Sequence, residues 1–389
     1  MTACRTGQRY DISAGFRGCR ARWLPPCRGG PQGQARAASL SARVAVLSLA
    51  APLVPRPRAP RPGDYRVRVL RSPLPPGSRT PTSGHAGHEP DLDELVERTV
   101  GWFATARRDL PWRAADRTPW GVLVSEVMLQ QTPVVRVEPA WRAWMERWPT
   151  PAHLAAASTA DVLRAWDRLG YPRRALRLQE CARAVVERHG GAVPDDEEAL
   201  RALPGIGEYT AAAVRAFAFG RRSVVVDTNV RRVLARTITG AALPAPSPTA
   251  AERAVAAAVV PDGDADAAAW AAASMELGAL VCTARSPHCL TDPGACPVAD
   301  LCAWRAAGYP ADEHAHRRRA QSWHGTDRQC RGRIMAVLRT APGPVGRVAL
   351  DAALATEPDD PQVTRCLGGL VEDGLVEQDD AGAYRLPED

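Results

Sequence analysis

The stretch Leu203-Pro204-Gly205-Ile206-Gly207, followed directly by Glu208-Tyr209-Thr210-Ala211, lies between two segments with helical periodicity. Two glycines around one apolar residue allow the backbone to turn tightly. The N–H groups of this turn then point outward at the start of the next helix, where they form an anion site with the positive helix end. We therefore expect a helix-hairpin-helix in which Gly205, Ile206 and Gly207 bind a DNA phosphate. An ordinary helix–Gly–helix turn is the alternative, which these five residues alone do not exclude.

Helical patterns surround this hairpin on both sides. Apolar residues at helical spacing follow Asp91, which predicts a first helix behind an aspartate cap. Thr118-Pro119 and Thr132-Pro133 each combine a capping residue with a proline at the first helical position, so they predict two further helices. Ser223–Val226 is β-branched enough for a strand but too short to found a sheet. The predicted fold class is therefore all-α.

Residues 1–88 differ from the rest of the chain in composition. They contain fifteen Arg and only two acids, so this tail carries +13; since the whole chain carries +7, the remainder carries −6. The tail is rich in Arg, Pro, Gly, Ala and Ser without helical or strand periodicity, and we expect it to be disordered. An over-extended start of translation is the other interpretation. DNA binding by the remainder must then depend on local features.

The chain has no apolar run of the roughly 18–20 residues that a membrane span requires, because Val44–Val54 is too short. The Arg-rich stretch before it partly resembles a signal or transit peptide, but no small-residue cleavage site follows cleanly. We therefore expect no membrane partner.

The segment after residue 310 begins with a connector over 311–328 that contains Arg317-Arg318-Arg319. Three short helices are then predicted, at Gly332–Leu338, Val348–Ala355 and Pro361–Asp373, before a short Tyr384-Arg385-Leu386 strand. This order resembles a small winged-helix module. The predicted domains are a tail (1–88), a helix-hairpin-helix domain (89–310) with a cysteine loop (282–302), the connector (311–328) and the winged-helix-like module (329–389).

Four cysteines, Cys282, Cys289, Cys296 and Cys302, follow the spacing C-x6-C-x6-C-x5-C. Four thiolates in one place hold zinc or a [4Fe–4S] cluster, or pair as disulfides. The short C-x2-C knuckles of structural zinc sites are absent, whereas gaps of five and six suit the larger cubane. A disulfide framework is disfavoured without a credible secretion signal. The spacing therefore favours an iron–sulfur cluster over zinc.

Several motifs agree in order and spacing with one family. The hairpin, an Asp about twenty residues later and the four cysteines resemble the helix-hairpin-helix glycosylase superfamily that includes endonuclease III. Further motifs over 91–310 resemble its MutY-type adenine glycosylases: Asp109-Leu110-Pro111-Trp112-Arg113, Ser125-Glu126-Val127-Met128-Leu129-Gln130-Gln131-Thr132, Leu169-Gly170-Tyr171, Val226-Asp227-Thr228-Asn229-Val230 and Met275-Glu276-Leu277-Gly278-Ala279.

This resemblance assigns two carboxyl groups to cleavage of the N-glycosidic bond. The reaction needs an acid that protonates adenine and a carboxylate that stabilises an oxocarbenium-like state. By similarity Glu126 is the acid and Asp227 is the carboxylate. The apolar neighbours of Glu126 should raise its pKa, as an acid requires. For Asp227 a helix N-cap is the alternative role.

Other site residues are likewise implied by the resemblance. Tyr209 and Asn229 should lie near the sugar. Trp112, Arg113 and Leu129 should surround the extruded base, and Gln131, Thr132, Leu169 and Tyr171 should enter the duplex, because extrusion requires both a pocket and a wedge. Core packing for Trp112 and Leu129, and an ion pair for Arg113, are the alternatives. Relatives often carry an acid or amide four residues before Glu276, where this chain has Ala272, so one adenine contact is expected to be missing.

The sequence contains no lysine, since all fifty basic residues are Arg. Related lyases cut the strand through a lysine Schiff base at the hairpin position where this chain has Tyr209. Without lysine only the α-amine could form such an imine. We therefore expect a monofunctional enzyme, a cytoplasmic bacterial monomer that associates with the nucleoid when it binds double-stranded DNA containing adenine opposite 8-oxoguanine or guanine.

Two features depart from the family. The usual spacing is C-x6-C-x2-C-x5-C, and here the widened middle gap contains Pro293-Gly294, which should bulge outward in a turn. Asp292 stands where the third cysteine would ordinarily fall, so it is a further candidate ligand. Many relatives also end in a Nudix-like domain that recognises 8-oxoguanine, and the residues after Pro310 are too few and too helical for it. Preference for the oxidised partner is therefore less firmly implied than adenine excision.

Three other functions compete with adenine excision. A thymine/uracil mismatch glycosylase is the nearest, and Glu126 argues against it. A non-catalytic iron–sulfur DNA-damage sensor has no need of two carboxylates. A zinc-binding transcription factor leaves Glu126 and Asp227 unexplained.

Overall fold

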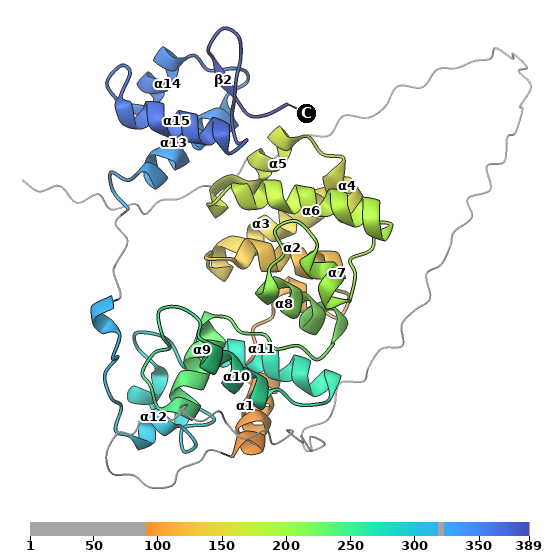
Figure 1. The fold of residues 1–389 in the computed structure, drawn as a ribbon, viewed down its shortest axis with the longest axis vertical. Coiled ribbons are helices and arrows are strands. Elements are labelled where there is room, and N and C mark those ends of the chain that lie inside the picture. Colours follow the sequence, from red (N-terminus) through yellow and green to blue (C-terminus); the bar gives the residue numbers. More distant parts are fainter. Residues whose placement is uncertain (1–90, 318–322, 389) are drawn as a thin grey trace, which may run out of the picture. The chain divides into compact units, whose positions relative to one another are not determined.

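The computed structural model describes residues 91–317 and 323–388, whose regular secondary structure is almost entirely helical (Figure 1). The predicted tail and Arg318-Arg319 of the connector lie outside these described residues. The all-α prediction is confirmed, and Ser223–Val226 has no regular secondary structure. No helix in the described ranges has the length and apolar character needed to cross a membrane.

The elements up to the hairpin are α1 (Leu92–Ala106), η1 (Pro111–Arg113), α2 (Pro119–Leu129), α3 (Val134–Arg147), α4 (Pro151–Ala155), α5 (Thr159–Trp166), η2 (Asp167–Leu169), α6 (Arg173–His189), α7 (Glu197–Arg201) and α8 (Glu208–Phe219). The elements up to the connector are α9 (Thr228–Leu234), η3 (Ala235–Thr239), α10 (Ala250–Val259), α11 (Asp264–Leu280), η4 (His288–Leu290), η5 (Pro293–Ala295), α12 (Ala303–Ala306) and η6 (Ala315–Arg317). The last elements are α13 (Asp327–Thr340), α14 (Arg347–Leu354), α15 (Pro361–Glu372), β1 (Glu377–Gln378) and β2 (Tyr384–Arg385).

The helix starts follow local capping chemistry. Asp91 accepts hydrogen bonds from the first turn of α1, and Thr118 Oγ1 accepts one of 3.0 Å from the Gly121 amide, as predicted. The prediction that Thr132 caps α3 is wrong, because Pro133 occupies the cap position. The Thr132 hydroxyl instead donates to the carbonyl oxygen of Leu169 at 3.2 Å. A hydrogen bond to a distant loop thus stands in place of the predicted cap on α3.

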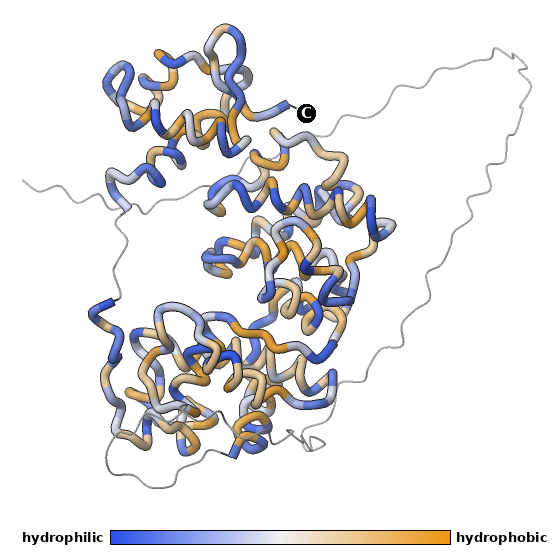
Figure 2. Tube along the Cα trace, viewed as in Figure 1, coloured by the Kyte–Doolittle hydropathy of each residue, from blue (hydrophilic) through white to orange (hydrophobic). Residues whose placement is uncertain are grey.

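Two large hydrophobic cores and two smaller clusters organise the described part of the helical domain. Helix α1 packs against α10 and α11, far from it in sequence, and shares a core with Val230 and Trp270 (Figure 1). The other core contains α2, whose residues from Trp120 to Met128 are all buried. A helix that is apolar on all sides is expected at the centre of a bundle. Most other helices alternate hydrophilic and hydrophobic residues, which indicates one buried face (Figure 2).

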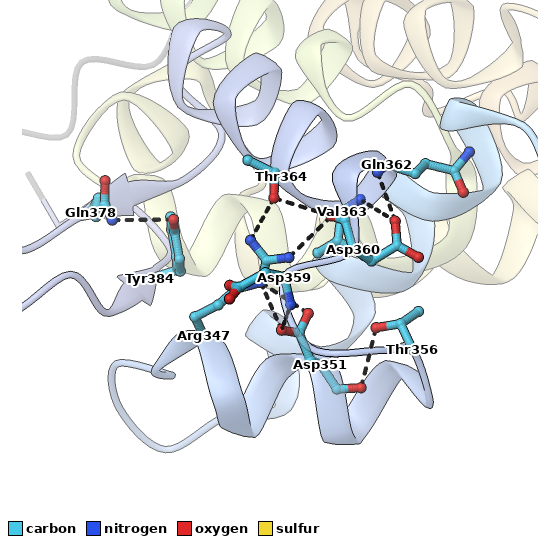
Figure 3. Close-up of polar contacts among 10 residues, drawn as sticks. All are labelled: Arg347, Asp351, Thr356, Asp359, Asp360, Gln362, Val363, Thr364, Gln378 and Tyr384. Atoms are coloured by element: carbon cyan, nitrogen blue, oxygen red, sulfur yellow. Dashed lines mark hydrogen bonds and ion pairs between the residues drawn. The ribbon is translucent and has the colours of Figure 1, made fainter.

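The C-terminal module consists of α13 to α15 and a short antiparallel hairpin, in which β1 pairs with β2 and Val345 adds an isolated bridge to Tyr384. The three predicted helices and the strand are present, although α13 begins at Asp327 because Thr326 caps it. Figure 3 shows Arg347 joining α14 to α15: its guanidinium donates to Asp351 at 2.9 Å and to Thr364 Oγ1 at 2.8 Å. This ion pair explains why Asp351 is buried.

Candidate active site

Glu126 is a buried carboxyl in a nearly apolar helix. It lies in α2 and is 5% exposed, with buried Ser125 and Val127 on either side. Burial raises the pKa of Glu126 to about 7, because the charged form loses its hydration. A neutral carboxylic acid near physiological pH is the form that donates a proton. The arrangement therefore suits general acid catalysis.

Tyr209 contacts this carboxyl directly. It stands in the first turn of α8 and its phenol donates a 2.9 Å hydrogen bond to Glu126 Oε2. This bond opposes the rise in the pKa of Glu126, since it favours the charged carboxylate. Burial raises the pKa of Tyr209 well above its usual value, so the phenol stays protonated.

Asp227 is the second carboxyl of the cluster. Its Oδ1 accepts a 2.6 Å hydrogen bond from the Val230 amide, which makes it the N-cap of α9, and its Oδ2 accepts one of 2.7 Å from Asn229 Nδ2. Burial raises the pKa of Asp227, while these two hydrogen bonds oppose the rise. The negative charge of Asp227 in turn raises the pKa of Glu126, so the two carboxyls sense each other electrostatically. The capping role and a role beside the reacting sugar are therefore compatible.

Arg232 and Gly278 fix the position of Asn229. Arg232 is 5% exposed and donates 2.7 Å hydrogen bonds to Asn229 Oδ1 and to the Gly278 carbonyl. It also donates to the carbonyl of Cys282 at 2.6 Å, so the cysteine loop is tied to the start of α9. A Cβ atom on Gly278 would meet Asn229 Cβ at 2.6 Å. Only glycine allows α11 to approach α9 this closely.

Arg113 forms an ion pair with the fully buried Glu276. Its guanidinium makes two hydrogen bonds of 3.0 and 3.1 Å to that carboxylate, and Arg108 supplies further ones at 2.9 and 2.6 Å. Although burial opposes ionisation, these hydrogen bonds hold the pKa of Glu276 at about 2. The positive charge of Arg113 also lowers the pKa of Glu126. In this structure Arg113 therefore forms the ion pair that was the alternative to a role beside the extruded base. It still lies close enough to Glu126 to affect the pKa of that carboxyl.

None of the residues expected around the extruded base is fully exposed. Trp112 is 5% exposed and packs edge-to-face on Trp141 with ring centroids 5.7 Å apart. Leu129, the last residue of α2, is half-buried against the same core. Both residues thus have the core contacts that the alternative interpretation required.

The four residues expected to enter the duplex come from two loops that meet. Thr132 and Leu169 are buried and hydrogen-bonded to each other, whereas Gln131 and Tyr171 are exposed. Gln131 and Tyr171 have φ of 54° and 47°, in the left-handed region that non-glycine residues rarely adopt. The structure therefore brings these four residues together and presents two of them to solvent.

The hairpin joins α7 to α8. Gly205 has φ of 76°, and a Cβ atom there would lie 2.9 Å from Arg177 Cβ, so glycine is required. Ile206 is buried and anchors the turn, while Gly205 and Gly207 are exposed. Gly207 is the N-cap of α8, whose first amides have no intrahelical acceptor. The predicted tight turn is therefore present at the start of α8, and its binding of a phosphate stays a prediction.

The four cysteines line one cavity. Cys282, Cys289, Cys296 and Cys302 share its wall with Arg236, whose Nη1 donates to Cys282 Sγ at 3.3 Å. No group of three His, Cys, Asp or Glu side chains in the described ranges is already set as a metal site. Four thiols around one cavity with a nearby guanidinium nevertheless fit an anionic thiolate cluster in their donor chemistry.

Asp292 does not belong to this cavity wall. Its Oδ1 accepts a 2.9 Å hydrogen bond from the Gly294 amide, and it caps the turn η5, which contains the predicted bulge. The three residues of η5 thus absorb most of the widened gap between Cys289 and Cys296. The side chain of Asp292 is exposed, which disfavours it as a ligand.

The arginines that organise the site were not predicted from the sequence. Arg232 ties α9 to the cysteine loop, and Arg174 of α6 donates to both duplex-facing loops. Arg108 completes the pair with Glu276. In a chain with fifty Arg, nothing in their spacing distinguishes these from surface residues. The one available signal was the position of Arg174 three residues after the Leu169-Gly170-Tyr171 motif.

Residues 124–259 match the family model described as "HhH-GPD superfamily base excision DNA repair protein". The adenine DNA glycosylase of Mycobacterium tuberculosis (strain CDC 1551 / Oshkosh) is 50% identical over 288 residues, which cover 74% of this chain and 92% of that protein. The adenine DNA glycosylase of Mycolicibacterium smegmatis is 52% identical over 287 residues, covering 74% and 94%. Among solved structures, a thermostable thymine-DNA glycosylase is 27% identical with a TM-score of 0.49, covering 56% of this chain and 97% of its own.

Proposed function

Because the chain belongs to the adenine DNA glycosylase family, within the HhH-GPD superfamily of base excision DNA repair proteins, we propose that it excises adenine paired with 8-oxoguanine or guanine. Adenine excision is the activity of this family, and the enzyme is a hydrolase of N-glycosyl bonds. The partner base, the site residues and the mode of cleavage are the parts that we propose. The observation that carries them is the buried cluster of Glu126, Tyr209 and Asp227.

In the proposed mechanism Glu126 protonates the extruded adenine. The base then leaves as neutral adenine and not as an anion, which is a poor leaving group. The pKa of Glu126, about 7, keeps much of this carboxyl protonated under physiological conditions. Asp227, held by Val230 and Asn229, would stabilise in its carboxylate form the positive charge that develops on the sugar. General acid catalysis of this kind contributes roughly 10²–10⁴ to a rate.

The reaction ends with hydrolysis and leaves an abasic site. A β-lyase needs an amine that forms a Schiff base with the opened sugar, and the sequence has no lysine. Tyr209, at the hairpin position where related lyases carry that lysine, is protonated and hydrogen-bonded to Glu126. We therefore propose a monofunctional enzyme.

Double-stranded DNA is the proposed substrate of a monomeric, cytoplasmic enzyme that associates with the nucleoid when bound. The exposed glycines of the hairpin would bind a phosphate next to the target. Gln131 and Tyr171 would enter the duplex and contact the orphaned partner base, while Trp112, Arg113 and Leu129 would border the adenine.

Cys282, Cys289, Cys296 and Cys302 are the residues that would hold a [4Fe–4S] cluster. Bound there, the cluster would brace the cysteine loop. Arg236 would offset the negative charge of the thiolates. Arg232, which donates to the Cys282 carbonyl and to Asn229, would connect the position of the loop to that of Asn229.

An assay of strand cleavage tests the proposal. Purified protein is incubated with duplexes holding one adenine opposite 8-oxoguanine, guanine or thymine, and each sample is divided before alkali treatment. Breaks that appear only after alkali, opposite 8-oxoguanine or guanine, are expected. Breaks without alkali would refute the monofunctional proposal, and equal cleavage opposite thymine would refute the proposed partner preference.

The variant Glu126→Gln separates this proposal from the DNA-damage sensor. The glutamine keeps the shape of the side chain but cannot act as the acid, so adenine release should be lost while duplex binding persists. Unchanged adenine release would remove Glu126 from the mechanism. A thymine/uracil activity is disfavoured because the relatives that are 50% and 52% identical to this chain are adenine DNA glycosylases.

A further inference from the structure

Arg174 is the centre of a hydrogen-bond network between the two duplex-facing loops. Its Nη1 donates to the carbonyl oxygens of Val127, Met128 and Gln130 at 2.9, 3.1 and 2.6 Å. Its Nη2 donates to Thr132 Oγ1 and to the carbonyl oxygens of Leu169 and Gly170, at 3.1, 3.1 and 2.9 Å. One guanidinium thus binds both loops: the first loop, which contains Gln130 and Thr132, and the second loop, which contains Leu169 and Gly170.

The two Nη atoms of this guanidinium bind different sets of residues, which overlap only in the loop after α2. Nη1 binds carbonyls at the C-terminal end of α2, which have no amide partner within the helix. Val127 and Met128 directly follow Glu126, so the same helical turn carries the carboxyl and accepts from Arg174. Nη2 binds Leu169 and Gly170 in the loop that leads to Tyr171, and it also binds Thr132. The planar guanidinium of Arg174 therefore connects the loop before Tyr171 to helix α2, which carries Glu126.

Both loops have backbone conformations that need external support. Gln131 has φ of 54° and Tyr171 has φ of 47°, a strained region for residues other than glycine, and such conformations persist only where the surrounding structure holds them. The acceptors of Arg174 lie immediately before these two residues, at Gln130 and at Gly170. The guanidinium also stacks over Trp166 at 5.2 Å from the ring centroid, which fixes its plane.

We propose that Arg174 is a positioning residue that couples contacts made by Gln131 and Tyr171 on the partner strand to the placement of Glu126. This inference rests on the proposed function, since it assumes that those two residues contact the orphaned base. It adds that a displacement of either loop moves the end of α2, so the partner base affects the rate of excision and not only binding.

The first test needs no activity. Hydrogen–deuterium exchange is compared between the wild type and the variants Arg174→Lys and Arg136→Ala. A single ammonium cannot span both sets of acceptors, so Arg174→Lys should speed exchange in both loops. Arg136 is the matched control, because its guanidinium donates to the Arg168 carbonyl of the second loop alone. If Arg174→Lys leaves hydrogen–deuterium exchange unchanged in the loop that contains Gln130 and Thr132, the proposed coupling between the loops and Glu126 is overturned.

The second test separates rate from affinity. Single-turnover excision is measured at saturating enzyme on duplexes with 8-oxoguanine or guanine opposite adenine, and affinity is measured on a duplex with a non-cleavable adenine analogue. Arg174→Lys should lower the excision rate at least about tenfold and reduce the discrimination between the two partners, with affinity changed by less than about threefold. Arg136→Ala should keep the discrimination of the wild type.

A parallel loss of rate and affinity in Arg174→Lys, with discrimination intact, would show a purely structural role. If Arg174→Lys does not fold, Thr132→Val replaces it: this change keeps the shape but removes one Arg174 acceptor and the bond to Leu169. It should reproduce the split between rate and affinity, and its failure to do so would overturn the inference. An inactive wild type would instead refute the proposed function, while the exchange data would still decide the coupling.

Discussion

The phenol of Tyr209 donates a 2.9 Å hydrogen bond to Glu126, across 83 residues of sequence. Tyr209 belongs to the first turn of α8, directly after the hairpin, and Glu126 belongs to α2. The element proposed to bind a DNA phosphate therefore also holds the proposed proton donor. Docking of the hairpin on the backbone would fix the register of α8 and, through Tyr209, the orientation of the acid.

The pH dependence of excision should report the ionisation of Glu126. Because only the protonated carboxyl donates, the single-turnover rate should fall as the pH rises through about 7. Tyr209→Phe removes a hydrogen bond that favours the charged form, so the pKa of Glu126 should rise further and the alkaline limb should move to higher pH. Rates between about pH 5 and about pH 9 test this. A limb that stays in place would assign it to another group.

Gly278→Ala should disable the site without touching a carboxyl. Its new Cβ would lie 2.6 Å from Asn229 Cβ and 2.9 Å from the Asn229 carbonyl oxygen, so α9 must shift together with Asp227. We expect a loss of about 1–3 kcal/mol in the free energy of unfolding and a larger relative loss of excision. Gly101→Ala is the control, because its Cβ would meet nothing within 4 Å in α1. It should stabilise by about 0.5–1 kcal/mol in urea unfolding and leave the rate unchanged.

Glu276→Gln should lower the free energy of unfolding by about 2–3 kcal/mol, because it breaks charged hydrogen bonds from Arg108 and Arg113. The same group should give the wild type an acid-dependent stability. Its folded pKa of about 2 lies below the ordinary 4.5, so its contribution is present above 4.5 and is lost as the pH falls toward 2.

Urea unfolding across this acid range measures that contribution, which Glu276→Gln should lack. Glu138→Gln is the matched control, since Glu138 pairs with Arg142 on the surface of α3. Its effect should stay within about 0.5 kcal/mol. Equal effects of the two variants would contradict the structural role assigned to Glu276.

Cys296→Ser should reduce the bound iron and the visible iron–sulfur absorbance of the purified protein, whereas Asp292→Ala should retain both. Cys296 lines the cavity of the four thiols, and Asp292 caps the neighbouring turn η5. Loss of this cap should cost about 0.5–2 kcal/mol of stability without loss of iron. Iron lost from Asp292→Ala but kept by Cys296→Ser would make the carboxylate the ligand.

Much of the fold was predictable from the sequence because its signals are local. A capping residue followed by proline specifies the start of α2, and Gly205 in the hairpin specifies a turn that favours glycine. The run of apolar residues around Glu126 indicated a buried acid, and the structure gives that acid a raised pKa. Where a local signal failed, at Thr132, a contact with Leu169 from a distant loop replaced the predicted cap.

By itself, then, the sequence determined the helical class, the hairpin, the cysteine spacing and the absence of lysine, since these depend on residue identity and near neighbours. Only the tertiary structure decided that Arg174 binds both duplex-facing loops, one of them across 44 residues, and that Arg113 pairs with Glu276 across 163. Such contacts depend on which helices pack together. That choice is made by burial of the whole core, which the spacing of an individual arginine does not encode.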